Sequence, residues 1–402
     1  MSRNLIVVTT IFFVCLTLAI LGGMVWGNTL YAHDHPGEKD FLVPWLAART
    51  FLDYGDSPYS GPATQRAQIV HYGRIADDGE DPLILWLSFP AELFYFPLAL
   101  IPDYALARGL WMTLSEAALV ASAFVALQLT GWKPSRFLLP LALLFPLLWI
   151  FGFMNLLASS PVPFVVLASV GALLSLRSGQ DEVAGALLVV PLLKIGIFSI
   201  FLLFVLWWSI YHRRWRVLAG LGMALGILLL LSFLLLPDWI MPFVRGLYWH
   251  TNHNPGLSFY RVLGSIWPVV GPRLGWALTA FLLVMLFVEW REVCYKDFRH
   301  TLWTVCLTLA VTPLLGFPLA VNDFAILVLP LFLVVTILGE RWPGRRLRGP
   351  AGIVLVAAWI ALWGLAPAPG LAPLLPILLV IGLYWIKWWA VRPPRTALEI
   401  LP

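Results

Sequence analysis

The sequence predicts an all-α integral membrane protein that crosses the bilayer many times. Of its 402 residues, 60% are hydrophobic and only 12% are charged, with a mean hydropathy of +0.87. A soluble domain lacks the surface to accommodate so much apolar area, so lipid must solvate most of this chain. Several apolar windows also reach the length of roughly 20 residues that a spanning helix needs. None alternates with the period of 2 that barrel strands require.

Apolar windows of spanning length recur along the whole chain. Because a bilayer core admits only helices or closed barrels, we expect about 10–12 membrane-spanning helices in one membrane domain, 1–402. The first window is longer than the apolar core of a signal peptide, roughly 7–15 residues, and is predicted to be a retained anchor. The windows are 5–30, 104–129, 136–154, 156–176, 183–211, 216–236, 272–290, 301–320, 323–338, 351–366 and 371–389.

The basic residues predict the orientation. Most of them fall in one set of loops, which is therefore expected on the cytoplasmic side together with both termini. This distribution also explains the pI of 9.2 without a nucleic-acid partner. The other side carries two long external segments, 31–103 and 237–271, in which we expect short amphipathic helices and the active site. We expect a multi-pass protein of a bacterial plasma membrane. The loops in question hold Arg3, Lys133, Arg136, Arg177, 212–216, Arg291, Lys296, Arg299, 339–348, Lys387, Arg392 and Arg395.

The window 183–211 carries cytoplasmic signals at both ends, RSGQDE before it and HRRWR after it. A single crossing is then excluded, and the window is too short for two full crossings. We therefore predict a broken pair of half-helices with its apex at PLLKIG, 191–196. This places Lys194 deep in an apolar run, where a charge is costly and typically marks a functional cavity. The alternative is a lysine that snorkels to the interface.

Asp40 opens an amphipathic segment directly after the first window. Apolar residues follow it with helical spacing, Pro44 falls in the first turn, and Gly55 closes the segment. We expect Asp40 at the N-cap of a short helix lying along the membrane surface. A plain helix cap and a general base are compatible roles, because a carboxylate at the positive end of a helix stays ionised.

The second external segment combines aromatic residues with cations and amides, a composition that suits a sugar and a phosphate. It is equally typical of an interfacial loop. Five of the seven histidines lie on external segments, and the motifs HDH and HTNH could in principle bind a metal. No further ligand spacing supports a metal, so we expect no cofactor and interpret these side chains either as hydrogen-bonding groups around a polar substrate or as solvated loop residues. The residues concerned are Arg245, His250, His253, Asn254 and Arg261.

Asn322 and Asp323 lie at the predicted external end of a span, either as a helix cap or as a second polar contact of the same cavity. Motifs for ATP-driven transport and for ordinary hydrolases are absent from the sequence. Cys15, Cys294 and Cys306 imply neither a disulfide framework nor a metal site. Any chemistry is therefore expected at the external face, where these polar groups would gather in one hollow.

The stretch KDFLVPWLAARTFLDYGDSPYSG resembles the first external loop of the polytopic GT-C glycosyltransferases, specifically glycosyltransferase family 87. That family shows an acidic residue followed by an apolar one, a helix with small residues, and then Gly-Asp-Pro-Tyr. Ser57 is inserted in the last of these motifs, and Ala91 replaces the second proline of a later one. The matching residues here are Asp40-Phe41, Ala47-Ala48, Gly55-Asp56, Pro58-Tyr59, Phe89-Pro90, Pro97-Leu98, Ile101-Pro102, Ala105 and Leu110-Trp111.

The resemblance implies a GT-C-type helical bundle that transfers a sugar from a polyprenyl-phosphate donor to a lipid or glycan acceptor, with inversion. The sugar would be mannose or another hexose or pentose. Asp40 would be the general base. Lys194, Arg245 and Arg261 would bind the donor phosphate, and His250, His253, Asn254, Asn322, Asp323 and Tyr59 would line the sugar and acceptor site. Two other functions stay open, a transporter or flippase of a lipid-linked saccharide and a non-catalytic scaffold of envelope assembly.

Overall fold

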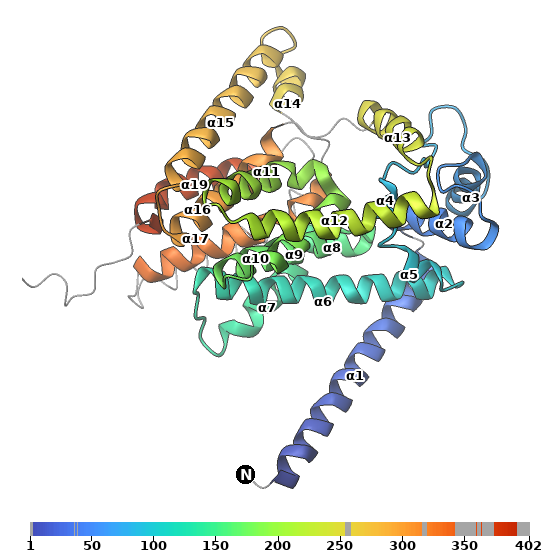
Figure 1. Ribbon diagram of the computed structural model, residues 1–402, viewed down its shortest axis with the longest axis horizontal. Coiled ribbons are helices and arrows are strands. Elements are labelled where there is room, and N and C mark those ends of the chain that lie inside the picture. Colours follow the sequence, from blue (N-terminus) through green and yellow to red (C-terminus); the bar gives the residue numbers. More distant parts are fainter. Residues whose placement is uncertain are drawn as a thin grey trace, which may run out of the picture. The chain divides into compact units, whose positions relative to one another are not determined.

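The computed structural model describes residues 3–35, 37, 39–253, 259–315, 320–341, 359, 363 and 374–391. These residues form helices joined by turns and contain no β-strand, which confirms the predicted all-α membrane protein (Figure 1). The chain divides into two compact units. Unit 1 comprises Met1–Ala118, Leu156–Pro161 and Leu230–Tyr248, and unit 2 comprises Leu119–Asn155, Val162–Leu229 and Trp249–Pro402.

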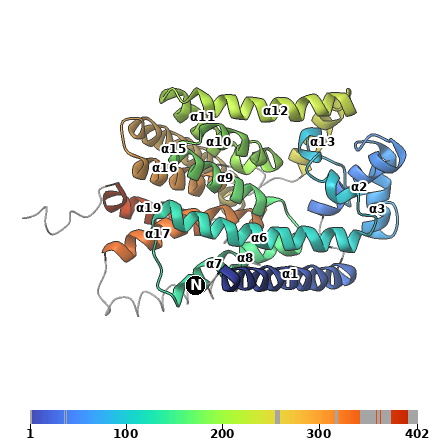
Figure 2. The same ribbon diagram turned by 60° about the horizontal axis from the view of Figure 1, so that its bottom comes forward.

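In unit 1, the first long helix α1 (Arg3–Asp34) meets the first turns of α6 (Tyr104–Thr130), as Figures 1 and 2 show. Gly109 makes this possible, because a Cβ at that position would collide with Thr29. The Asn28 amide donates to Thr113 Oγ1 at 3.0 Å and lies 3.2 Å from a Glu116 carboxylate oxygen. Most of the α1 apolar side chains whose burial is described are exposed, as expected of a helix that faces lipid.

Four short helices follow in unit 1: α2 (Lys39–Tyr54), α3 (Gly61–Tyr72), α4 (Phe89–Glu92) and α5 (Phe96–Ala99). Helix α2 ends where predicted, since Gly55 adopts a φ of 72° that side-chain-bearing residues rarely adopt. It begins at Lys39, so Asp40 lies in the first turn and not at the predicted N-cap. Its buried face is tied to α5 by Trp45 Nε1, which donates to Leu98 O at 3.0 Å.

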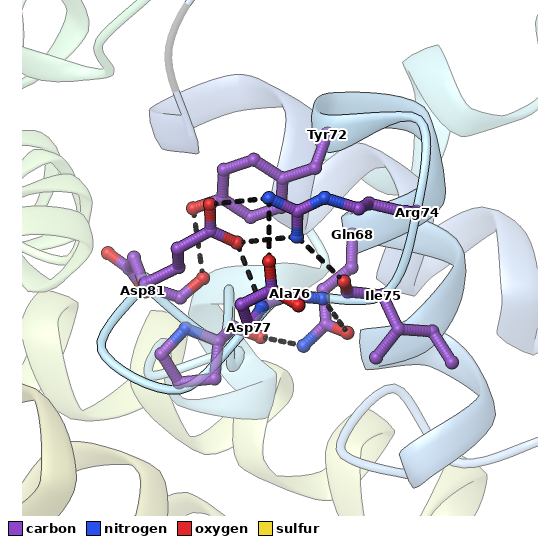
Figure 3. Close-up of polar contacts among 9 residues, drawn as sticks. Gln68, Tyr72, Arg74, Ile75, Ala76, Asp77 and Asp81 are labelled. Atoms are coloured by element: carbon purple, nitrogen blue, oxygen red, sulfur yellow. Dashed lines mark hydrogen bonds and ion pairs between the residues drawn. The ribbon is translucent and has the colours of Figure 1, made fainter.

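The loop after α3 is held by the polar network drawn in Figure 3. Arg74 binds both Glu80 carboxylate oxygens at 2.8 Å and lies 3.0 Å from Asp77. The Tyr72 hydroxyl donates to Asp81 O at 3.1 Å, and the Asp81 carboxylate pairs with Lys39. The loop is therefore tied to the residue immediately before Asp40, and it helps to fix the start of α2.

Unit 2 is built around α16 (Phe298–Val311), in which every residue from His300 to Val311 is buried. It packs against α11 (Ile195–Tyr211), α15 (Gly271–Val293), α17 (Val328–Arg341) and α19 (Leu374–Val391). Beside these helices, α14 (Phe259–Ile266) folds back on α15, because Gly275 lets the two backbones approach at Tyr260. A helix enclosed by protein in this way serves as a core element and not as a lipid-facing span.

The predicted broken pair is present in unit 2 as α10 (Asp181–Leu187), the 3-10 turn η1 (Val190–Lys194) and α11. By length and composition, Asp181–Tyr211 qualifies as one span. Its ends nevertheless lie together, because Arg214 Nη1 is 3.2 Å from Asp181 Oδ1 and donates to Leu176 O at 2.8 Å. A straight helix of this length would separate them by roughly 45 Å. The segment therefore turns back at η1, as predicted (Figure 1).

Seven helices among the described residues are long and apolar enough to cross a membrane, or eight if the bent pair α7 (Leu138–Leu148) and α8 (Ile150–Ala158) is one span. Fewer spans are found than predicted, because α9 (Val162–Arg177) and α16 are short. The predicted span 351–366 lies almost wholly outside the described residues. The remaining elements are α12 (Trp215–Leu235), α13 (Ile240–His253), η2 (Thr312–Leu314) and η3 (Val321–Leu327).

Candidate active site

Asp40 lies in the first turn of α2, in unit 1, and its side chain is only partly exposed. A carboxylate in the first turn of a helix interacts favourably with the positive end of the helix dipole. Directly after it, Phe41 is completely buried against Trp111 at a ring-centroid distance of 5.2 Å. The acidic group is thus attached to a rigid part of unit 1, next to an aromatic core.

Tyr95 belongs to this aromatic core, and the charge of Asp40 acts on its hydroxyl group. Its ring stacks on Trp111 at 5.0 Å and is wholly buried, and its hydroxyl has no hydrogen-bond partner among the described residues. Burial raises the pKa of the Tyr95 hydroxyl well above its ordinary value, and the negative charge of Asp40 and, when it is ionised, that of Glu92 raise it further. Two carboxyl groups therefore act on one buried hydroxyl.

Glu92, at the end of α4, is the second of these carboxyl groups. It is 0% exposed, and neither of its oxygens makes a hydrogen bond within the described part of the chain. Burial raises the pKa of the Glu92 carboxyl well above its ordinary value, and the nearby Ala48 backbone N–H lowers it only in part. The protonated, neutral form is favoured, in contrast to the partly exposed Asp40.

Tyr59, predicted as a sugar or acceptor contact, lies in the same unit. Its hydroxyl donates to Leu87 O at 2.7 Å, which connects the GDSPY turn to the segment before α4. Burial raises the pKa of the Tyr59 hydroxyl, and so does the charge of Glu92. Unit 1 thus collects Asp40, Tyr59, Glu92 and Tyr95 in one acid–tyrosine cluster, and this name is kept below.

Arg108, on α6 in the same unit, is also completely buried. Its guanidinium donates to Ser159 Oγ at 2.9 Å, to Leu157 O at 2.7 Å and to His35 O. A buried cation held by backbone carbonyl groups joins three segments of unit 1 that are distant in sequence. Gly37 lies against the same guanidinium with a φ of 81°, and a Cβ there would collide with it.

In unit 2, the structure brings together two residues that the sequence assigned to different roles. Lys194 Nζ lies 3.9 Å from Asp323 Oδ1, and the two side chains are 11% and 4% exposed. Lys194 is the last residue of the turn η1, at the apex predicted for it. The snorkelling alternative is wrong, because the side chain ends at a buried carboxylate. A phosphate bound by Lys194 would have to share this cation with Asp323.

Asp323 is a helix cap, which is one of the two roles predicted for it. Its Oδ2 accepts a hydrogen bond from the Ala320 N–H at 2.8 Å, so it caps η3 and contacts Lys194 at the same time. The adjacent Asn322 is bound through its backbone, since the buried Asn155 amide donates to Asn322 O at 2.7 Å. The side-chain carbonyl oxygens of Asn155 and Asn322 have no hydrogen-bond partner among the described residues.

The remaining predicted residues lie on α13 and α14. Arg245, in unit 1, and Arg261, in unit 2, are both exposed. In unit 2, His250 is partly exposed, whereas the exposed His253 stacks on Trp249 at 4.3 Å with its Nδ1 2.9 Å from Trp249 O. Asn254 lies outside the described residues. Arg245, Arg261 and His253 are thus exposed to solvent, whereas Glu92 and Tyr95 of the acid–tyrosine cluster are completely buried.

One feature of the sequence could have identified Glu92 as a candidate site residue, although no motif includes it. It is the one charged residue between Pro82 and Asp103, and a lone charge in an apolar run favours a functional role. Arg108 was missed because it is one of several polar positions in the window 104–129, which is otherwise typical of a spanning helix. The comparisons with known proteins add nothing to these assignments: no family model, no curated protein and no solved structure matches the chain.

Proposed function

We propose that this multi-pass membrane protein is a glycosyltransferase that moves a sugar from a polyprenyl-phosphate donor to a hydroxyl group of a lipid or glycan acceptor. The reaction takes place at the extracytoplasmic face of a bacterial plasma membrane, with both termini in the cytoplasm. The observation that carries the proposal is the acid–tyrosine cluster. In it, a partly exposed Asp40 in the first turn of α2 lies within electrostatic range of Tyr95, next to the neutral acid Glu92.

The two acids of the cluster divide the roles. A general base must be ionised and accessible, whereas a completely buried carboxyl group is neither. Environments that separate two carboxyl groups in this way identify the base in many enzymes. Asp40 is therefore the base, and Glu92 is a buried acid that does not compete for the proton.

In the proposed step, Asp40 accepts the proton of the acceptor hydroxyl while the hydroxyl oxygen forms a bond to the anomeric carbon. The bond from this carbon to the donor phosphate breaks, and its electron pair leaves with the phosphate. The configuration at the anomeric carbon inverts because attack and departure occur on opposite faces. Lys and Arg side chains can neutralise the leaving phosphate, and Lys194, Arg245 and Arg261 are still predictions for this role.

The test is a transfer assay with the full chain in nanodiscs and a radiolabelled polyprenyl-phosphate hexose. Asp40→Asn removes the base without changing the shape of the side chain, and turnover is expected to fall by about 10²–10⁴-fold. Asp53→Asn is the matched control, because Asp53 belongs to the same helix and pairs on its surface with Arg49 at 2.9 Å. The control variant should transfer at the rate of the unmodified protein.

Wild-type turnover by a folded Asp40→Asn variant would exclude Asp40 as the base. Absence of transfer by the unmodified protein, with every donor sugar and acceptor tried, would remove the enzyme proposal itself. The assay is repeated with a chelator, because sustained transfer would exclude a required divalent metal.

A second candidate is a transporter or flippase of a lipid-linked saccharide. The buried ion pair between Lys194 and Asp323 favours it, since charges in the spanning region commonly mark a substrate pathway. Proteoliposomes containing a fluorescent lipid-linked saccharide distinguish the two functions. Protein-dependent movement of the label between leaflets, without any covalent transfer, would support transport.

A further inference from the structure

Three potential metal ligands converge in unit 2, and none of them belongs to the candidate active site described above. Glu289 and Glu292 are in the last turns of α15, and His300 is in the first turn of α16. One ligand atom from each side chain lies within 4.8 Å of the other two. Glu289 and His300 are buried, whereas Glu292 is exposed, so the group is accessible from solvent on one side.

The side chain of Lys387 brings a positive charge to the two carboxylates of this group. Lys387, on α19, places its Nζ 2.7 Å from both oxygens of Glu289 and 3.3 Å from Glu292 Oε2. The Tyr384 hydroxyl donates to Glu289 Oε1 at 3.0 Å. The two carboxylates are therefore arranged around a positive charge that the chain itself supplies.

His300 is not explained by this ion pair. It is 0% exposed, and neither ring nitrogen has a hydrogen-bond partner among the described residues. Buried polar groups nearly always have partners, and one that lacks them at the edge of a carboxylate pair needs an explanation. A purely structural salt bridge would account for Glu289, Glu292 and Lys387 but would leave the imidazole unused.

We propose that Glu289, Glu292 and His300 form a binding site for a divalent transition-metal cation, with Lys387 as its internal competitor. Two carboxylates balance the charge of a divalent ion, and an imidazole nitrogen favours zinc and its neighbours over magnesium or calcium. When the metal binds, the Lys387 ammonium leaves Glu289 for solvent. Its side chain is 27% exposed, so this movement requires no opening of the core.

Competition between Lys387 and the metal for Glu289 predicts how each substitution changes the affinity for Zn²⁺. The ammonium and the metal need the same Glu289 oxygens, so removing the ammonium removes the cost of displacing it. Lys387→Gln is expected to bind Zn²⁺ at least about tenfold more tightly than the unmodified protein, a difference of about 1.4 kcal/mol. Glu292→Gln and His300→Gln, which each remove a ligand of a three-ligand site, are expected to weaken binding by about tenfold or more.

Isothermal titration of Zn²⁺ into the tag-free full chain in nanodiscs measures these affinities. Glu292 has a largely exposed side chain, so Glu292→Gln should fold even if His300→Gln does not. Glu340→Gln is the matched control, because this acidic residue pairs with Arg299 at 2.6 Å and is not one of the three ligands. Its Zn²⁺ affinity should be unchanged. Co²⁺ then reports the ligands directly, since its visible spectrum should change in the Glu292→Gln protein.

Two results would overturn the proposal. Absence of Zn²⁺ binding in both the unmodified protein and Lys387→Gln would show that the group is only an ion pair with a buried histidine. Equal Zn²⁺ affinity and equal Co²⁺ spectra in the unmodified, Glu292→Gln and Glu340→Gln proteins would show that the metal binds elsewhere on the chain.

Discussion

Each unit buries a carboxyl group that the sequence places in an apolar setting, and the two groups are stabilised in different ways. Glu92 in unit 1 is 0% exposed and has no hydrogen-bond partner among the described residues. Asp323 in unit 2 is 3% exposed, accepts a hydrogen bond from Ala320 N–H and lies 3.9 Å from the ammonium of Lys194. Burial favours the protonated form of the first acid, whereas the second lies beside a cation and accepts a hydrogen bond from an amide, two contacts that favour a carboxylate.

The difference shows that burial alone does not determine what a carboxyl group contributes. Replacing a neutral buried acid by its amide removes almost no charge from the protein interior. Removing one member of a buried ion pair leaves the other charge uncompensated in a medium of low dielectric constant. Substitutions at Glu92 and at the Lys194–Asp323 pair should therefore change the free energy of unfolding by different amounts. The following experiments measure this difference.

The largest effect is expected at the ion pair of unit 2. Lys194→Gln leaves Asp323 charged and buried, which should lower the free energy of unfolding by about 3–5 kcal/mol. The double variant Lys194→Gln with Asp323→Asn removes both charges and should recover most of the loss. Unfolding of the unmodified protein, of Lys194→Gln, of Asp323→Asn and of the double variant in mixed micelles measures the differences.

An additive double variant, with a loss equal to the sum of the two single losses, would contradict an ion pair between these residues. Kinetics separate a further role of Lys194 from its effect on stability. If Lys194 also binds the donor phosphate, the double variant should regain stability but not transfer activity.

A smaller, pH-dependent effect is expected at Glu92. Burial raises the pKa of this carboxyl above its value in the unfolded chain, so its contribution to stability is complete below the unfolded pKa and is lost as the pH rises through the folded pKa. Within that window, the free energy of unfolding should fall by up to about 1.4 kcal/mol per pH unit. Glu92→Gln cannot titrate, and its stability should lack this slope.

Glu80, in the network of Figure 3, gives a control of opposite sign. Hydrogen bonding to Arg74 lowers the pKa of the Glu80 carboxyl, so its contribution is present above the unfolded pKa and is lost as the pH falls through the folded pKa. Glu80→Gln should therefore remove a dependence at acidic pH and leave the slope from Glu92 intact. An unchanged slope in Glu92→Gln would show that Glu92 is charged in the folded protein.

The sequence predicted those features that depend on local composition. The turn at 191–196 followed from charged loops at both ends of a window too short for two crossings, and Lys194 lies at that turn because the apolar run is centred on it. The pairing of Lys194 with Asp323 could not be predicted, because it depends on the tertiary packing of α9 against both η1 and η3. A two-residue shift at the start of α2, from residue 41 to Lys39, moved Asp40 from the N-cap into the first turn, within the usual uncertainty of helix ends.

The polar residues that are completely buried were the hardest to predict. Glu92, Tyr95 and Arg108 belong to no motif, and their importance depends on three segments of unit 1 that come together only in the folded chain. The exposed Arg245, Arg261 and His253 were easier to select, because cations and imidazoles in an aromatic loop are visible in the sequence. Their roles in binding are still predictions.

Tyr59 gives the smallest expected effect and separates a structural role from a binding role. Its hydroxyl donates to Leu87 O at 2.7 Å, so Tyr59→Phe should lower the free energy of unfolding by about 0.5–1.5 kcal/mol through loss of one hydrogen bond. Tyr72→Phe is the matched control, since that hydroxyl donates to Asp81 O at 3.1 Å in the same unit. If Tyr59 also contacts the sugar, its variant alone should raise the KM for donor or acceptor. If both variants lose similar stability and keep the KM, Tyr59 acts only through Leu87, and the acid–tyrosine cluster is reduced to Asp40, Glu92 and Tyr95.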